Sequence, residues 1–132
     1  MGTLARSVLV TGFPGRQPAI HLVRALATRG TRSVCCVVTE ARKERAQELI
    51  DALPAEARER VTLWVGDPRS IDLGLSGEEL AVLTERVEVI HHCATVTDPA
   101  ATKEEAEGNV KATAEILEFA ETAPRLQRLV YW

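Results

Sequence analysis

Five short apolar runs recur along the chain, and the segments between them have the apolar spacing of helices. The runs cover residues 8–10, 34–38, 61–65, 87–90 and 129–132. They are continuous and rich in β-branched side chains, which is typical of strands covered on both faces of a parallel sheet. Strands that alternate with helices imply right-handed crossovers. The sequence therefore predicts an α/β domain with a doubly wound parallel sheet whose strands are ordered 3-2-1-4-5.

Two of the intervening segments indicate where their helices end. Residues 20–27 place apolar side chains on one side of a helix, and Gly30 is a natural helix end. Another helix repeats apolar residues at i, i+3, i+4 and i+7 and is expected to end at Pro54. Its apolar residues are Ala46, Leu49, Ile50 and Leu53.

Two later segments indicate where their helices begin. Ser76 and Glu79 have the spacing of a capping box, in which each side chain binds a free amide at the helix start. Asp98 and Pro99 are predicted to open the last helix as its cap and its first residue. We expect that helix to run to about residue 123, with or without a break near Gly108.

Size, charge and cysteine usage exclude several classes of protein. The chain has 132 residues, 45% of them apolar and 27% charged, which fits a single domain spanning 1–132. Its 16 basic and 19 acidic residues are mixed along the chain, so no basic stripe is available for nucleic acid. No apolar run approaches the roughly 18 residues that span a bilayer, and we expect a cytoplasmic protein with no membrane partner. The three cysteines lack regular spacing and are expected to be reduced.

The turn after the first predicted strand contains two glycines, Gly12 and Gly15. A dinucleotide's pyrophosphate fits against such a turn only if the main chain comes close without intervening side chains. The helix that follows offers free amides and the positive end of its dipole. The turn therefore predicts a dinucleotide site, and the alternative is a tight strand-to-helix turn without a ligand.

Further motifs follow that turn in a recognisable order. They are Thr11-Gly-Phe-Pro-Gly15, Gly66-Asp67, Asp72-Leu-Gly-Leu-Ser76, Ile90-His-His-Cys-Ala94 and Asn109-Val-Lys-Ala-Thr113. Taken together, they resemble the extended short-chain dehydrogenases/reductases, in particular the fatty acyl and thioester reductases, over nearly the whole chain. The fourth motif is similar to the family's His-x-Ala-Ala, and the fifth to its Asn-Val-x-Gly-Thr.

The resemblance implies a three-layer Rossmann-type fold that binds NADP(H) or NAD(H). It places Gly12 and Gly15 at the pyrophosphate, Asp67 near the adenine, Ala94 along the cofactor cleft and Asn109 near the nicotinamide. The cofactor-binding residues predicted in this way are Thr11, Gly12, Phe13, Pro14, Gly15, Arg16, Thr39, Arg42, Asp67, Pro68, Cys93, Ala94, Thr95 and Asn109.

The end of the second strand favours NADP over NAD. The family often has an arginine there, whereas this chain has Thr39, followed shortly by Arg42 and Lys43. No aspartate is present at the strand end to bind a free ribose hydroxyl.

The glycine motif departs from the family after Gly15. Arg16, Gln17 and Pro18 stand where the family has an aromatic residue, an aliphatic residue and a third glycine. Pro18 removes an amide from the helix start and adds bulk there, which weakens the expected cofactor affinity. Arg16 could compensate by pairing with a phosphate oxygen, and the alternative is a solvated arginine.

The chain also departs from the family in its catalytic residues. The family's reaction needs a Tyr-x-x-x-Lys pair, but the only tyrosine is Tyr131 and all the lysines precede it. We therefore assign no catalytic residue and expect no turnover by this chain alone. In a complete protein, the resemblance implies hydride transfer to a thioester, aldehyde or ketone.

The chain stops within the fifth predicted strand, which leaves that strand and the helix over residues 99–123 with uncovered apolar faces. An open sheet edge invites pairing with another chain, so we expect a homo-oligomer formed through one of these elements. The alternative function is accordingly a non-catalytic Rossmann module used for self-assembly or protein interaction.

His91, His92 and Cys93 are adjacent groups that can bind metals. Strand alternation sends His92 to the face opposite the other two, so we predict no metal site. His92 is not expected to be catalytic. Cys93 could be reactive if a positive site lowers its pKa, but buried thiols are usually inert.

Overall fold

The computed structural model of the chain describes residues 6–94 and 100–132 and contains a five-stranded parallel sheet. The strands are β1 (Ser7–Thr11), β2 (Ser33–Val38), β3 (Val61–Val65), β4 (Val87–His92) and β5 (Arg128–Tyr131). Their order is β3-β2-β1-β4-β5. The predicted fold class and strand order are therefore confirmed.

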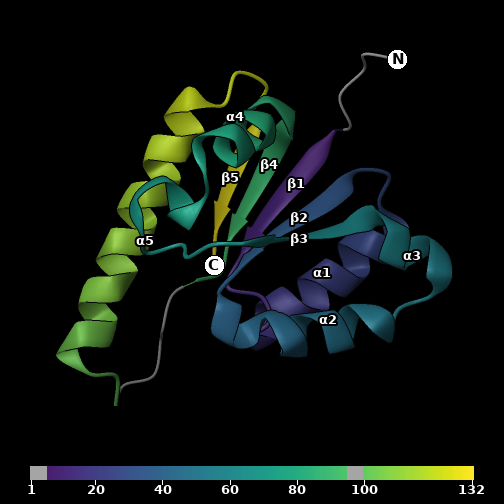
Figure 1. Cartoon of the computed structure of the whole chain (residues 1–132), viewed down its shortest axis with the longest axis horizontal. Helices are drawn as coiled ribbons and strands as arrows, with labels where there is room; N and C mark the ends of the chain where they lie inside the picture. Colours follow the sequence, from purple (N-terminus) through teal and green to yellow (C-terminus); the bar gives the residue numbers. More distant parts are fainter. Residues whose placement is uncertain (1–5, 95–99) are drawn as a thin grey trace.

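Helices cover both faces of this sheet and make three layers (Figure 1). α1 (Gln17–Arg29) and α2 (Lys43–Asp51) lie on one side, whereas α4 (Gly77–Arg86) and α5 (Lys103–Thr122) lie on the other. The short helix α3 (Ala55–Arg60) and the 3-10 turns η1 (Glu40–Arg42) and η2 (Ile71–Gly74) complete the connections. The sequence did not predict α3 because it buries only Ala57 and has no apolar repeat.

Successive side chains of the central strands enter two separate cores. On the side of α1 and α2 the core contains Val8, Val10, Val34, Cys36, Ala19, Val23 and Ile50. On the side of α4 and α5 it contains Leu9, Cys35, Val37, Leu83, Ile90, Ile116 and Phe119. This burial on both faces explains why the strand sequences are continuously apolar. The adjacent Cys35 and Cys36 point to opposite faces, and both are free thiols.

The helix ends follow the sequence in two places and depart from it in one. α1 ends at Arg29 before Gly30, as predicted. The capping box at α4 is present: Glu79 N donates to Ser76 Oγ at 3.1 Å, and Ser76 N donates to Glu79 Oε1 at 3.0 Å. The helix that was expected to end at Pro54 is α2, which ends earlier, at Asp51. Pro54 instead lies at the start of α3.

The predicted start of the last helix is wrong. α5 begins at Lys103, and Ala100 to Thr102 are not helical. Thr102 Oγ1 accepts a hydrogen bond from Glu105 N at 3.1 Å and caps the helix, the role that was expected of Asp98. Asp98 and Pro99 themselves lie outside the described residues. α5 runs through Gly108 without a break.

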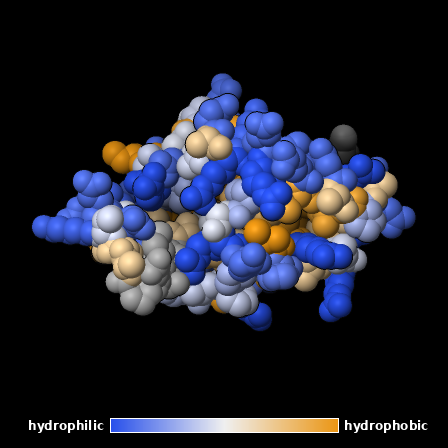
Figure 2. Space-filling model, turned by 90° about the horizontal axis from the view of Figure 1, so that it is seen from below, coloured by the Kyte–Doolittle hydropathy of each residue, from blue (hydrophilic) through white to orange (hydrophobic). Residues whose placement is uncertain are grey.

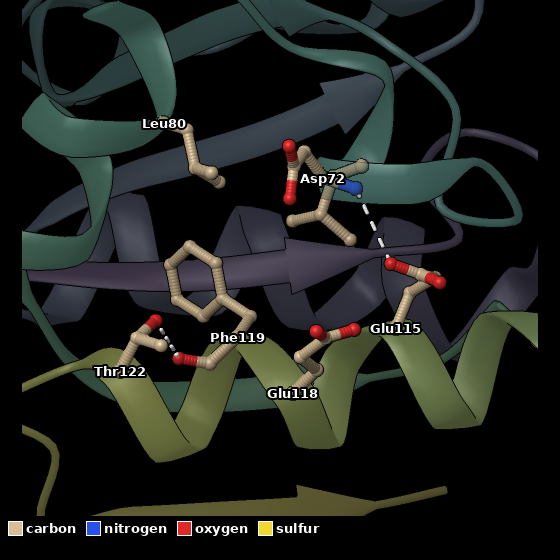
Figure 3. A pocket seen from close by; sticks show the side chains of 7 residues that line it. Asp72, Leu80, Glu115, Glu118, Phe119 and Thr122 are labelled. Atoms are coloured by element: carbon tan, nitrogen blue, oxygen red, sulfur yellow. Dashed lines mark hydrogen bonds between the residues drawn. The ribbon is translucent and has the colours of Figure 1, made fainter. Parts of the chain in front are cut away.

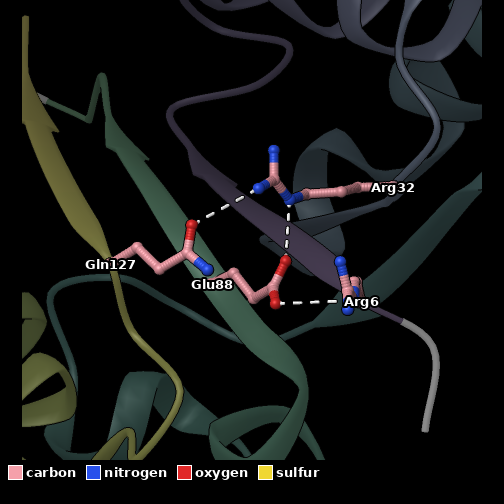
Figure 4. A network of polar contacts seen from close by, with 4 residues as sticks. All are labelled: Arg6, Arg32, Glu88 and Gln127. Carbon is pink, nitrogen blue, oxygen red and sulfur yellow. Dashed lines mark hydrogen bonds and ion pairs between the residues drawn. The ribbon is translucent and has the colours of Figure 1, made fainter.

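A buried carboxylate ties the strands together at the amino-terminal end of the sheet (Figure 4). Glu88 on β4 accepts a hydrogen bond from Arg32 Nε at 2.9 Å and lies 3.8 Å from Arg6 Nε. Arg32 Nη2 reaches Gln127 Oε1 at 3.5 Å, and Gln127 N donates to Glu88 O at 2.7 Å. This network leaves the carboxyl ends of the strands available for a ligand.

Candidate functional site

The connections of the sheet reverse direction between β1 and β4, because the chain winds from β1 to β3 on one side and continues to β4 and β5 on the other. In open α/β sheets, ligands bind outside the carboxyl ends of the strands at such a reversal. The β1 turn, residues 12–15, lies at this point. The topology therefore places the predicted glycine motif where a nucleotide site is expected.

Gly12 makes the closest approach between the β1 turn and β4. It has a φ of +91°, and a Cβ atom there would lie 2.5 Å from Cys93 O and 2.9 Å from Ala94 N. A side chain at this position would therefore be strained and would overlap main-chain atoms. The structure brings together Gly12, Cys93 and Ala94.

Thr11 holds the ends of β1 and β4 in register. Cys93 N donates to Thr11 O at 3.2 Å and to Thr11 Oγ1 at 3.1 Å. Thr11 Oγ1 also forms a hydrogen bond of 2.7 Å with Nδ1 of His92. Thr11 is fully buried in these contacts.

Arg42 lies directly against Gly15. A Cβ atom built on Gly15 would overlap the guanidinium of Arg42, which comes from η1 after β2. Arg42 N donates to Thr39 O at 3.0 Å. The structure thus brings the side chain of Arg42 to the β1 turn, and Thr39 lies three residues before it.

The start of α1 faces this turn with a reduced set of amides. Arg16 N donates to Gly12 O at 3.0 Å, and Ile20 N donates to Arg16 O at 3.1 Å. Pro18 is exposed in the first turn of α1 and has no amide to donate. The amides of Gln17 and Ala19 lie in the turn where a helix supplies no i−4 partner. They are the donors that α1 can offer to an anion.

Phe13 and Pro14 do not present their side chains to this site. Both residues are buried, and Phe13 packs in the core on the side of α1 and α2. Only their main chain is available to a ligand in the turn.

Asp67 is linked to α5 by Arg69, a residue that the sequence analysis did not identify. Its Oδ1 accepts hydrogen bonds from Arg69 N at 2.9 Å and from Arg69 Nε at 3.3 Å. Arg69 in turn packs on α5, where a Cβ at Gly108 would lie 3.2 Å from Arg69 Cδ. Pro68, which lies between Asp67 and Arg69 in the sequence, is buried. The carboxylate predicted to approach the adenine is therefore already paired with a cation.

Three further predicted residues lie near the end of β4 or on α5. Burial raises the pKa of the Cys93 thiol to about 11, although Arg16 acts in the opposite direction, so a reactive thiolate is not favoured at neutral pH. Asn109 is half-buried on α5. Thr95 lies outside the described residues.

His91 and His92 face different partners, as strand alternation predicts. Trp132 Nε1 donates to His91 Nδ1 at 3.1 Å, whereas His92 bonds to Thr11. Within residues 6–94 and 100–132, no cluster of side chains suited to a metal ion is present. None of the helices in this part of the chain is long and apolar enough to cross a membrane.

Two cavities lie away from the glycines of the turn. Figure 2 shows hydrophobic surface on the side of α1 and α2, where Ile20, Leu49 and Leu53 help to line a cavity of about 310 Å³. A smaller cavity of about 90 Å³ lies between η2, α4 and α5, and Asp72 N donates there to Glu115 Oε1 at 3.2 Å (Figure 3). The smaller cavity is lined by none of the predicted cofactor-binding residues, and the larger one is lined by one of them, Phe13.

The sequence of this chain matches a known protein family. The NAD-binding family model described as male sterility protein matches residues 10–132. No curated protein matches the chain in sequence.

Solved reductase domains have a similar fold. The terminal R domain from the myxalamid PKS-NRPS biosynthetic pathway is 26% identical with a TM-score of 0.78, and the match covers 99% of this chain and 35% of that chain. The reductase domain of a non-ribosomal peptide synthetase from Mycobacterium tuberculosis is 26% identical with a TM-score of 0.76, covering 96% and 32%. The PhqB reductase domain from Penicillium fellutanum is 26% identical with a TM-score of 0.69, covering 98% and 37%. This chain spans about a third of the length of these solved chains.

Proposed function

This chain belongs to the NAD-binding family described as male sterility protein, and from that membership we propose that residues 1–132 form one dinucleotide-binding domain of a reductase of the short-chain dehydrogenase/reductase type. The domain is its amino-terminal part and lacks the substrate-binding part. A cytoplasmic, reducing location is supported by the three free, buried cysteines.

The observation that carries this proposal is the bare main chain at the reversal point of the sheet. Gly12 has no room for a side chain beside the main chain of Cys93 and Ala94, and a side chain at Gly15 would displace the guanidinium of Arg42. A diphosphate needs this kind of close main-chain approach next to a helix start. The residues present therefore fit the dinucleotide that the family binds.

Arg42 supports a preference for NADP. Its guanidinium lies at the β1 turn and follows the end of β2, the strand end at which dinucleotide-binding domains contact the adenine ribose. A guanidinium pairs with a 2′-phosphate through charge-assisted hydrogen bonds, for which NAD has no counterpart.

The reaction of the complete protein is proposed from the resemblance to be hydride transfer to a thioester, aldehyde or ketone. When bound, the nicotinamide would supply the hydride. This chain contains no Tyr-x-x-x-Lys pair, since its only tyrosine, Tyr131, follows every lysine. The residues of this chain bind and orient the cofactor, and they do not provide the proton donor of the family mechanism.

Titration with NADPH and NADH, followed by fluorescence or calorimetry, tests the cofactor site. Gly15→Val should abolish or strongly weaken binding, because the new side chain would block the close approach of the diphosphate to the main chain of the turn. Gly77→Ala is the matched control, since a Cβ at Gly77 meets no atom within 4 Å. No binding by the wild-type chain at millimolar dinucleotide, or equal binding by the two glycine variants, contradicts the proposal.

A second candidate function is a non-catalytic module that assembles through its exposed apolar residues. Tyr131 and Trp132 at the edge strand are 62% and 49% exposed, and Val110 and Leu117 on α5 are 70% and 48% exposed. Val110 and Leu117 are seven residues apart, so they lie on one side of the helix. Both surfaces are suited to a second copy of the chain.

Sedimentation velocity at tens of micromolar tests self-association. We expect a dimer or larger species for the wild-type chain, and a shift toward monomer for Val110→Asp combined with Leu117→Asp if α5 forms the contact. Trp132→Asp makes the same test of the β5 edge. A wild-type monomer under these conditions contradicts the assembly function.

A further inference from the structure

We infer that His92 is a positioning residue for the β1 turn, acting through the side chain of Thr11. This inference deepens the proposed function and rests on it. His92 is the last residue of β4, and it is fully buried. The next residue is Cys93, whose carbonyl lies against Gly12. The ring is therefore one residue away from the closest approach of the turn to β4.

The hydrogen bonds of Thr11 indicate which nitrogen of His92 carries the proton. Cys93 N donates to Thr11 Oγ1 at 3.1 Å, so this oxygen accepts there. The same oxygen lies 2.7 Å from His92 Nδ1, and the tautomer of the ring decides which of the two donates. Among the described contacts of Thr11, Nδ1 is the acceptor available to the hydroxyl proton, so we assign neutral His92 a bare Nδ1 and a protonated Nε2.

The proton on Nε2 connects the ring to α5. Thr113 Oγ1 lies 3.4 Å from His92 Nε2 and, with the ring in this tautomer, accepts the longer hydrogen bond. Thr113 and Asn109 are four residues apart on α5, so they share one face of the helix. His92 therefore joins the β1 turn, through Thr11, to the helix face that carries Asn109.

Without His92, the Thr11 hydroxyl would lose the acceptor that fixes its direction. Thr11 is β-branched and has few side-chain conformations, so a change of its rotamer would move Oγ1 away from Cys93 N. The Gly12 main chain lies next in the sequence and would lose part of its restraint against β4. A loosened turn binds a diphosphate less well because the turn must be ordered during binding.

Burial keeps the His92 ring uncharged at neutral pH, because it lowers the pKa of His92 from its usual 6.5. Among the described residues, the groups that face the ring are the hydroxyls of Thr11 from β1 and Thr113 from α5, and the ring of Tyr131 from β5 at a centroid distance of 5.7 Å. A proton on Nδ1 would turn this acceptor into a donor and displace the proton of Thr11. Dinucleotide affinity should therefore fall only as the pH drops below 6.5.

Three substitutions separate the two hydrogen bonds of the ring. His92→Asn retains an acceptor at the position of Nδ1, whereas His92→Gln retains a polar group at the position of Nε2. Thr113→Val removes only the longer hydrogen bond and preserves the side-chain shape. Thermal unfolding first establishes that each variant is folded. Each is then titrated with NADPH from about pH 7.5 down to about pH 5.5, the range in which histidines titrate.

The Kd of His92→Asn and of Thr113→Val should stay within about twofold of the wild-type value, and that of His92→Gln should rise about five- to tenfold, as expected for one lost buried hydrogen bond. The weakening at low pH should be much smaller in His92→Asn. Equal Kd values for His92→Asn and His92→Gln, or an unchanged pH profile in His92→Asn, overturn the inference.

Long-range proton–nitrogen NMR of the histidine rings needs no ligand. At neutral pH the proton of His92 should be on Nε2, and the Gly12 amide resonance should shift in His92→Gln and hardly in His92→Asn. A proton on Nδ1, or an unshifted Gly12 amide in His92→Gln, overturns the inference. If the NMR results are as expected but the wild-type chain binds neither NADPH nor NADH, the proposed function fails while the positioning of the turn by His92 stands.

Discussion

At the scale of single residues, the groups opposite the two glycines of the β1 turn differ in kind. Gly12 faces the main chain of Cys93 and Ala94, which cannot move without disturbing β4. Gly15 faces the end of the flexible Arg42 side chain. A substitution at Gly12 therefore affects the fold and the site together. At Gly15 the site is affected first, and for this reason Gly15→Val is the more informative variant.

Arg42→Ala should weaken NADPH binding about tenfold and leave NADH binding nearly unchanged, because it removes one charge-assisted contact to the 2′-phosphate. Arg45→Ala is the matched control, since Arg45 is an exposed arginine on α2 that lies 3.6 Å from Glu48. Parallel titrations with NADPH and NADH give the ratio of the two dissociation constants for each variant. An equal loss of NADPH and NADH affinity in Arg42→Ala would exclude Arg42 as a 2′-phosphate contact.

At the scale of elements, the beginning of α5 determines where the segment after β4 becomes helical. Thr102 caps the helix, and the carboxylates of Glu104 and Glu105 lie in its first turn, where the helix dipole favours negative charge. Asp98 and Pro99 have the same local signals, which is why the sequence predicted an earlier start. Two adjacent cap signals cannot be ranked from sequence alone.

Thr102→Ala should lower the free energy of unfolding by about 1 kcal/mol, because the amide of Glu105 loses its acceptor. Thr31→Ala serves as the control, since Thr31 is exposed between α1 and β2. Urea denaturation followed by circular dichroism measures both values. Equal stability of the two variants would show that Thr102 does not cap α5 in solution.

At the scale of the whole molecule, the two ends of the parallel sheet have different roles. The amino-terminal end is held by the Glu88 network, whereas the carboxyl end carries the glycine turn and the His92 contacts. Glu88 is only 6% exposed, so its charge depends on Arg32 for compensation. The stability of the fold and the binding of a ligand can therefore be changed separately.

Glu88→Ala should destabilise the fold by about 1–3 kcal/mol, because it removes the carboxylate that accepts the hydrogen bond of Arg32 Nε. Arg6→Ala removes the other ion pair of the same carboxylate. It should cost less than about 0.5 kcal/mol, since Arg6 is 75% exposed and 3.8 Å away. Urea denaturation again measures both variants. A loss in Arg6→Ala as large as that in Glu88→Ala would contradict the role assigned to Arg32.

The sequence by itself determined the elements and their order. Residues 34–38 read as a buried strand because their burial on both faces leaves a continuous apolar run, and Ser76 with Glu79 marked a helix start because a cap is a local interaction. The strand order followed from the alternation of strands and helices, which restricts the connections. The glycine turn was predictable for the same reason, since its motif is contiguous.

Only the tertiary structure decided which side chains meet at the site. Arg42 lies against Gly15, and Arg69 pairs with the carboxylate of Asp67. His92 forms hydrogen bonds with Thr11 and Thr113. Thr11 and His92 lie 81 positions apart, so no local pattern relates them. Their pairing depends on the side-by-side placement of β1 and β4 and on the direction of each side chain. Those directions are set by packing against the other layers of the fold, which a sequence pattern does not contain.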